Sequence, residues 1–237
     1  NWTRFAGSSL GMYYVAAASS IEKLKDLNDP RIDKLYLKPT NPAGAPHRGI
    51  RSGDGNVDPE YALVGAETDI EARKKYSNVN PLVFNPTAPV FFISSWESYF
   101  LQAEVLIRVG DASAETKFNE AVQSSFSYLG INDASSYLSA LNFGSASQDE
   151  KLNILAVQKW ISMNCVQMAE GWLETARLDR QGNYVFSKED GVFTNPTRNG
   201  LGERIYPSSF VYPTQEVSLN PNTPVGRKVS DKRFWDN

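Results

Sequence analysis

Two amphipathic helices within residues 94–129 constrain the fold of this chain more than any other feature. Apolar side chains recur at helical spacing before Gly110 and again after Asp111, which predicts a hairpin of two helices joined by a tight turn. The first stripe is Trp96, Tyr99, Phe100, Ala103, Leu106 and Ile107, and the second is Ala114, Phe118, Ala121, Val122, Ser125 and Leu129. Such a hairpin cannot bury both of its faces alone, so it is expected to belong to a larger helical scaffold.

The same hairpin matches part of a known repeat. Its Gly, Ala and Phe-x2-Ala pattern corresponds to the second half of a tetratricopeptide (TPR) unit, while the Trp-x2-Leu-Gly part is absent. Further helices are expected over residues 8–27, 133–141 and 148–179, and the last is apolar on several faces, which predicts a central position. We therefore expect an all-α protein with TPR-like hairpins and extensive irregular loops. Trp96, Trp160 and Trp172 lie on helical stripes, which predicts that they pack in the core.

Proline and glycine mark the non-helical parts. Residues 39–59 are too rich in both for regular structure and are expected to form a long loop, where ligand contacts tend to lie. Five prolines prevent long helices after Gly182: Pro196, Pro207, Pro213, Pro221 and Pro224. Residues 182–237 are therefore expected to wrap over the surface as loops and short strands. With 237 residues and no low-complexity linker, the chain is expected to form a single domain over 1–237.

Composition excludes several classes of function. The formal net charge is −3 with mixed signs, so the chain has no electrostatic footprint for nucleic acid. Cys165 and His47 are each the single residue of their type, which excludes an intrachain disulfide and the His and Cys clusters that zinc requires. The apolar run at residues 11–18 is too short to span a bilayer. Because the chain begins at Asn1 without Met, we expect a processed product or a fragment.

Short strings spread across nearly the whole chain resemble the C-terminal half of the SusD/RagB family of outer-membrane nutrient-binding lipoproteins, and its SusD-like group in particular. The order and spacing of these strings carry the resemblance, since no single string is specific. They are Asn28-Asp29-Pro30-Arg31; His47-Arg48-Gly49-Ile50 and Ser52-Gly53; Glu97 with Tyr99, Phe100, Ala103 and Glu104; Gln158-Lys159-Trp160; Glu170-Gly171-Trp172 with Arg177; Arg204-Ile205-Tyr206-Pro207; Tyr212-Pro213 with Glu216 and Asn220; and Phe234-Trp235-Asp236.

The resemblance implies a non-catalytic protein with a TPR-containing helical core. It implies a location on the outer surface of Gram-negative Bacteroidetes, reached through an N-terminal lipid anchor on a Cys that is not present in this chain. The implied partner is a TonB-dependent transporter of the SusC type, over which the protein closes as a lid. The implied ligand is an oligosaccharide or a peptide.

Candidate ligand-binding residues lie in or beside the early loops. Sugar capture needs flat aromatic faces and a few polar groups for hydroxyls. The candidates are Trp2, Tyr36, His47, Arg48, Arg51 and Tyr61, and the alternative for each is packing or a solvated loop position. Asp54, Asn56 and Asp58 offer oxygens at alternate positions, as in a calcium loop, although the EF-hand Gly and Glu are missing. No other cofactor is expected, and a structural Ca²⁺ competes with a plain turn.

Two other functions remain open from the residues. A TPR-like adaptor that holds a protein in its groove would use the same hairpin. A polar concave helical face would favour that adaptor, whereas exposed aromatics in the early loops would favour small-ligand capture. An all-α glycoside hydrolase could use Glu170 and Glu174, which lie one helical turn apart, although an ion pair of Glu174 with Arg177 is the plainer explanation.

Overall fold

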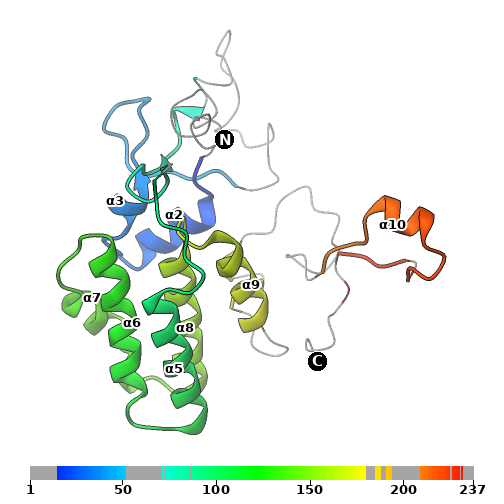
Figure 1. Cartoon of the computed structure of the whole chain (residues 1–237). Helices are drawn as coiled ribbons and strands as arrows, with labels where there is room; N and C mark the ends of the chain where they lie inside the picture. Colours follow the sequence, from blue (N-terminus) through cyan, green and yellow to red (C-terminus); the bar gives the residue numbers. More distant parts are fainter. Residues whose placement is uncertain are drawn as a thin grey trace.

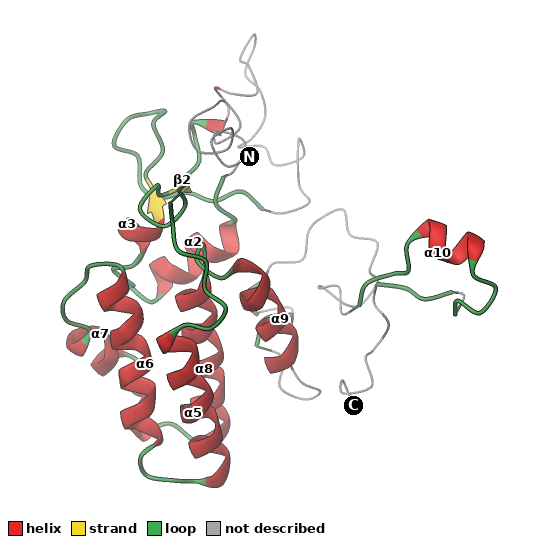
Figure 2. Cartoon of the chain, in the orientation of Figure 1, coloured by secondary structure: helices red, strands yellow, loops and turns green. Residues whose placement is uncertain are grey.

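The computed structural model shows a helical protein, as expected, with very little strand (Figure 2). The structure describes residues 15–51, 71, 73–85, 87–179, 185–187, 191–193, 209–224, 226–229 and 231. In chain order its elements are α2 (Ala18–Asp26), α3 (Ile32–Leu35), β1 (Tyr36–Leu37), β2 (Asn78–Val79), α5 (Ser95–Val109), α6 (Ala114–Tyr128), α7 (Ser135–Ala140), the 3-10 turn η3 (Phe143–Ser145), α8 (Gln148–Met163), α9 (Met168–Leu178) and α10 (Thr214–Leu219). Among the helices in these ranges, none is long and apolar enough to cross a membrane.

The predicted hairpin is confirmed as α5 and α6. Ser94 caps α5, because its hydroxyl accepts a hydrogen bond from the Glu97 backbone amide. In return, the Ser94 backbone amide donates to the Glu97 carboxylate. Gly110 ends α5 in the left-handed conformation, with a φ of 73°, which a glycine adopts without steric cost. Phe100 of α5 and Phe118 of α6 are fully buried, with their ring centroids 6.0 Å apart. The hairpin thus buries one face of each helix, as the stripes predicted.

The prediction of a single helix over residues 148–179 is wrong, because this segment forms two helices, α8 and α9. Asn164 is extended, and Cys165 takes a left-handed conformation with a φ of 62°. The Asn164 side-chain amide donates to the Tyr36 hydroxyl at 2.8 Å, which anchors the turn to another part of the chain. α9 then packs back on α8, where a Cβ built on Gly171 would lie 3.3 Å from the Cβ of Met163. The apolar faces that suggested one long helix therefore belong to two helices packed together.

The helix predicted over residues 8–27 is confirmed over Ala18–Asp26 as α2, whereas residues 15–17 are not helical and residues 8–14 lie outside the described part. Val15 pairs with Asn78, and Ala17 pairs with Ile50, as isolated bridges. These backbone bonds to distant segments replace the helical bonds that residues 15–17 would otherwise make. Tertiary pairing therefore overrides the local helical pattern at this end.

The body of the protein is a bundle in which α8 packs on α5 and α6, and α9 packs on α8 (Figure 1). Its core forms two clusters, one centred on the α5–α6 hairpin and the other on α2, α3 and the second half of α8. Leu27, Tyr128, Ile131 and Val166 pack against both clusters and join them. Trp96 and Trp160 are buried, as predicted, whereas Trp172 is only half-buried.

A buried ion pair lies where the two clusters meet. The Arg31 guanidinium is fully buried and donates to Asp29 Oδ1 at 2.9 Å and to Asp29 Oδ2 at 2.6 Å. It also donates to the side chains of Gln158 at 2.7 Å, Ser162 at 2.9 Å and Ser125 at 3.2 Å. One residue from the loop after α2 thus ties α6 and α8 together.

The expected irregular tail is described only in part. Residues 209–213 and 220–224 are loops on either side of α10, and no residue of α10 is buried. Figure 1 shows α10 standing apart from the helical body. The wrapping of residues 182–237 over the surface, and the single-domain organisation, stay predictions.

Candidate functional site

The early loop that the sequence singled out is held in place by backbone pairing. The Ile50 amide donates to Ala16, and the Ala18 amide donates back to Ile50, at 2.9 and 2.8 Å. Gly49 lies so close to this bridge that an added Cβ would be 2.5 Å from the carbonyl carbon of Ala17. On its other side, the loop pairs with the segment that leads into β2, where the Ser77 amide donates to Arg48 at 2.7 Å. The absence of a Cβ at Gly49 permits this arrangement.

His47 anchors the loop from inside. The ring is buried, with Nδ1 3.0 Å from the Ser77 hydroxyl and Nε2 2.9 Å from Asp33 Oδ1. These three side chains have the residue types of a hydrolytic triad. However, Ser77 is fully buried, and its hydroxyl already accepts the Arg48 amide at 3.1 Å. A substrate carbonyl cannot reach this oxygen, so the geometry is that of a structural clamp between the loop, α3 and the start of β2.

The other early-loop candidates have different surroundings. Tyr36 is buried, and burial raises the pKa of its hydroxyl well above the usual value. The half-buried Arg48 lies with its guanidinium 4.9 Å from the centroid of the Tyr76 ring, whereas Arg51 is exposed. Burial disfavours ligand contact by Tyr36 and His47, and Arg51 is the candidate that the structure leaves most open to solvent.

The remaining predicted site residues lie outside the described part of the chain. These are Trp2, Tyr61 and the calcium candidates Asp54, Asn56 and Asp58. Their roles stay predictions. In the part of the chain that is described, no group of three or more His, Cys, Asp or Glu side chains is placed to hold a metal ion.

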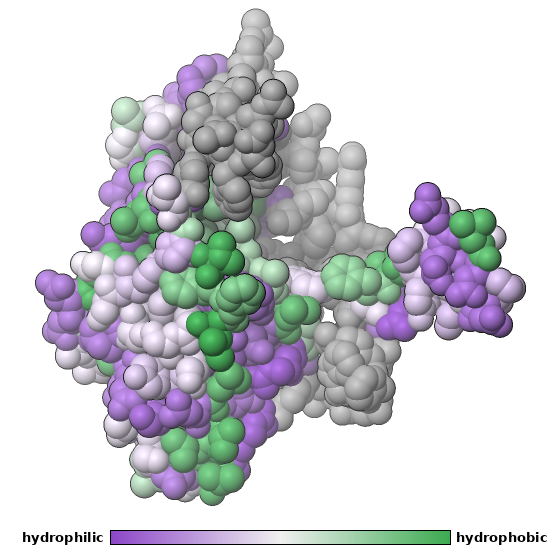
Figure 3. Space-filling model, in the orientation of Figure 1, coloured by the Kyte–Doolittle hydropathy of each residue, from purple (hydrophilic) through white to green (hydrophobic). Residues whose placement is uncertain are grey.

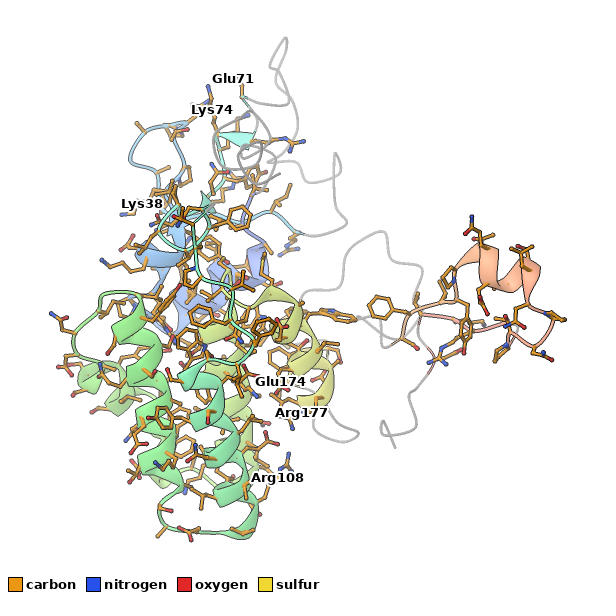
Figure 4. All side chains as sticks on the ribbon, in the orientation of Figure 1. Lys38, Glu71, Lys74, Arg108, Glu174 and Arg177 are labelled. Atoms are coloured by element: carbon orange, nitrogen blue, oxygen red, sulfur yellow. The ribbon has the colours of Figure 1, made fainter. Side chains whose placement is uncertain are left out.

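A chain of ion pairs occupies the junction of α5, α8 and α9. Arg177 donates to Glu104 at 2.6 Å and to Glu174 at 2.7 Å, and Lys159 donates to Glu174 at 2.6 Å. Lys159 is 1% exposed and Glu104 is 4% exposed, so both charges depend on these partners. Figure 4 shows Glu174 and Arg177 between α9 and α5, with Arg108 farther along α5. Arg108 completes the group by donating to Glu104 at 2.6 Å.

These contacts argue against the glycosidase hypothesis for Glu170 and Glu174. Burial opposes ionisation of Glu174, but the bonds from Arg177 and the charge of Lys159 outweigh it and lower the pKa of the carboxyl. A glycosidase acid needs the opposite, a raised pKa, so that it carries a proton at neutral pH. The expected ion pair of Glu174 with Arg177 is confirmed. The hydrogen bonds of Glu174 are therefore those of a structural ion pair rather than those of a catalytic acid.

Exposed aromatic rings also lie outside the early loops, at positions that the sequence did not propose as ligand-binding. Phe210 is 77% exposed, with its ring 5.4 Å from that of the half-buried Trp172 on α9. Two residues on, Tyr212 lies under the guanidinium of Arg227 at 6.0 Å, and Arg227 also bonds the Ser209 hydroxyl. The alternation Phe210-Val211-Tyr212 just before Pro213 is the signal that could have identified this exposed aromatic segment.

A shallow hollow lies at the corner between η3 and α8. Its volume is about 420 Å³. Its lining mixes polar and apolar side chains and consists of Leu141, Asn142, Ser145, Ala146, Glu150, Asn153 and Ile154. A concave helical face lined by polar side chains is the feature expected of the adaptor alternative, and this mixed hollow meets that description only in part.

Comparison with known families gives one match that spans most of the chain. The SusD-like family described as "Starch-binding associating with outer membrane" matches residues 5–213. No curated protein matches the chain.

Solved structures agree on the fold. A SusD homologue from Bacteroides vulgatus is 24% identical, with a TM-score of 0.58 over 75% of this chain and 39% of its own. A chitin-binding protein is 19% identical, with a TM-score of 0.65 over 93% of this chain and 49% of its own. A Bacteroidetes AC2a SusD-like protein is 15% identical, with a TM-score of 0.67 over 93% of this chain and 53% of its own. The chain thus spans about half the length of these proteins or less.

Proposed function

This chain belongs to the SusD-like family, and on that premise we propose that it forms part of a non-catalytic binding protein for oligosaccharide or peptide nutrients at the bacterial outer membrane. The family match over residues 5–213 is the observation that carries the proposal, because the family is described as starch-binding and associated with the outer membrane. A glycan is the favoured ligand, since one solved relative is described as a chitin-binding protein and another as a chitin-binding SusD homologue from Flavobacterium johnsoniae.

The proposal extends to the partner and the location. The captured nutrient would pass to a TonB-dependent transporter of the SusC type, and the protein would sit on the cell surface of a Bacteroidetes bacterium through an N-terminal lipid anchor outside this chain. Solved relatives from Bacteroides and Flavobacterium support the source. The handover and the anchor rest on the family alone.

The exposed aromatic segment gives the proposal a physical basis. Phe210 and Tyr212 are exposed aromatic residues, with Phe210 beside Trp172, and sugars stack on aromatic rings through their apolar C–H surfaces. Arg227 beside Tyr212 offers donors for hydroxyl groups. The absence of a reaction is itself part of the proposal, supported by the paired state of Glu174 and by the buried hydroxyl of Ser77.

A protein-binding adaptor is the second candidate. The hollow at the start of α8 is the observation behind this candidate, because hydrogen-bonding side chains in its lining, such as Asn142 and Glu150, suit a peptide backbone. An adaptor of this kind would bind no free glycan.

The test is a titration of the longest natural form of the protein with starch, chitin oligosaccharides, other polysaccharides and peptide pools. Calorimetry and tryptophan fluorescence report binding, and chromatography reports whether the ligand is cleaved. Saturable binding of an unchanged ligand is expected. A cleaved ligand would overturn the non-catalytic assignment, and a complete absence of binding would move the assignment to the adaptor.

Two variants locate the site. Replacing Phe210 and Tyr212 together with Ala should weaken glycan binding at least tenfold, equivalent to about 1.4 kcal/mol. The matched control is Leu219→Ala on α10, because Leu219 is 81% exposed in the same segment but has no ring. If the double variant binds the glycan as tightly as the control does, the aromatic segment is not the site.

A further inference from the structure

Arg227 places a positive charge beside the exposed aromatic segment. Its side chain is exposed, and its guanidinium lies 6.0 Å from the centroid of the Tyr212 ring. The backbone holds the two parts of the chain side by side, because the Ser209 amide donates to the Val229 carbonyl at 3.0 Å. Figure 3 shows hydrophobic residues, in green, on the stretch that links the helical body to α10. A cation and an apolar surface therefore meet at one place.

A buried hydroxyl fixes the position of this guanidinium. Ser209 is 8% exposed, and its hydroxyl accepts hydrogen bonds from Nε of Arg227, at 3.0 Å, and from Nη2. No contact in the described structure engages Nη1, which is a donor group in every guanidinium. One edge of the guanidinium is therefore held by the protein, and Nη1 is left to bond a ligand.

Other arginines of the chain have a different kind of partner. Each of three donates to a carboxylate oxygen at 2.6 Å, namely Arg31, Arg108 and Arg177. Arg227 has a neutral hydroxyl instead, and no carboxylate among the described residues forms an ion pair with it. Glu216 and Asp231, which lie in the same part of the chain, accept hydrogen bonds from other groups. The charge of Arg227 therefore has no counter-charge in the part of the protein that is described.

These features together suit an acidic sugar. A pyranose ring stacks on aromatic rings through its apolar C–H surface, and a carboxylate or sulfate group accepts strong, charge-assisted hydrogen bonds from a guanidinium. A neutral sugar would use the rings of Phe210 and Tyr212 and leave the charge of Arg227 without a partner. An acidic group on the sugar ring would satisfy both the rings and the charge.

We propose that Phe210, Tyr212 and Arg227 select acidic glycans, in which the sugar ring carries a carboxylate or a sulfate, over neutral glycans. The sugar ring lies on the aromatic side chains, and its acidic group pairs with Nη1 of Arg227. This inference rests on the proposed function, because it names the class of glycan that the exposed aromatic segment binds. Capture of neutral starch or chitin with equal affinity would keep the proposed function and contradict the inference.

Matched pairs of ligands test the proposal. The full chain is titrated by calorimetry with oligogalacturonate and with its methyl ester, which lacks the carboxylate charge. A second pair is κ-carrageenan oligosaccharide and its desulfated form, so the two pairs separate a carboxylate from a sulfate. The charged member of at least one pair should bind about tenfold more tightly than its neutral form. This preference should shrink as NaCl is raised from about 50 mM to about 300 mM, because salt screens exposed charges.

Three variants locate the charge that is responsible. Arg227→Gln should lower the affinity for the charged ligand about tenfold and leave that for its neutral form within about twofold, so the neutral form reports whether the site is still folded. Lys228→Gln is the matched control, because it removes the same charge from the next residue, which is also exposed. Arg227→Lys should keep part of the preference, since it retains a positive charge but lacks the guanidinium donors.

Each other outcome would overturn the inference in a recognisable way. Equal affinity for the charged and neutral members of both pairs would contradict it and leave glycan capture standing. A Lys228→Gln variant that loses the preference as fully as Arg227→Gln would show that diffuse charge, rather than Arg227, is responsible. Equally tight binding of oligoglutamate would show that the segment selects an acidic group without a sugar. Failure to bind any of these glycans would remove the inference together with glycan capture itself.

Discussion

The buried pair of Asp29 and Arg31 supports a quantitative prediction. Both residues are 1% exposed or less, and the guanidinium donates to the carboxylate and to three further side chains on α6 and α8. Burial alone would lower the pKa of Arg31, but the Asp29 charge outweighs it and raises the pKa, so Arg31 stays charged. The two charges offset each other's cost of burial, because each charge is stable in the core only beside the other.

Replacing Arg31 with Met keeps much of the side-chain volume and removes the charge. Asp29 is then a buried carboxylate without its cation, and we expect a loss of about 3–5 kcal/mol in the free energy of unfolding. Adding Asp29→Asn to the same variant removes the stranded charge, while an amide oxygen can still accept the backbone N–H of residue 31, now bonded at 2.9 Å. The double variant should therefore be more stable than the single one, by at least about 1 kcal/mol.

Urea unfolding at neutral pH, followed by tryptophan fluorescence and circular dichroism, measures both variants. Arg51→Met is the control, because Arg51 is exposed, and its change should stay within about 0.5 kcal/mol. The reasoning would be refuted if Arg31→Met cost less than about 1 kcal/mol, or if the double variant were no more stable than the single one. An m-value that differs between variants would show that the comparison is not two-state.

Two further predictions concern the core and the response to acid. Trp160→Ala should cost about 3–5 kcal/mol in chemical denaturation, because Trp160 packs edge-on against Phe186 and Phe193; a loss below about 1 kcal/mol would place it outside the core. Burial opposes ionisation of Glu104, but the bonds from Arg177 and Arg108 prevail and lower its pKa to about 2. Because the pKa of Glu104 is lower in the folded state than in the unfolded state, where it is about 4.3, its ionisation stabilises the fold at pH values above about 4.3. This stabilisation is lost as the pH falls toward 2. Glu104→Gln should therefore reduce stability at pH 7 and flatten its decline between about pH 5 and pH 2, whereas Glu22→Gln on the exposed face of α2 should change neither.

The sequence predicted those parts of the fold that depend on local periodicity. The hairpin of α5 and α6 could be read because its stripes, the Ser94 cap and Gly110 act within a few residues. The break at Cys165 and the non-helical conformation of residues 15–17 could not, because both depend on partners far along the chain. The local sequence around Asn164 does not predict its hydrogen bond to Tyr36.

In the candidate site, too, the features that depend on distant parts of the chain could not be predicted from the sequence. His47 looked like a ligand-binding residue because it lies in a loop rich in Pro and Gly, yet Asp33 and Ser77 bury it from two directions. The prolines around Phe210 predicted only loops and short strands, and its 77% exposure depends on the absence of any covering segment in the described structure. The exposure of a side chain depends on the whole fold, so the sequence alone predicts poorly which residues can contact a ligand.

The residues shared by the two core clusters have a consequence for ligand screening. Leu27, Tyr128, Ile131 and Val166 pack against both clusters and couple them, so the segment around α2 and the hairpin should unfold in one transition. A molecule that binds only the folded loop then stabilises the hairpin as well, by mass action. A thermal-shift screen that follows helical ellipticity would consequently detect a ligand of the loop, even though no helix touches that ligand.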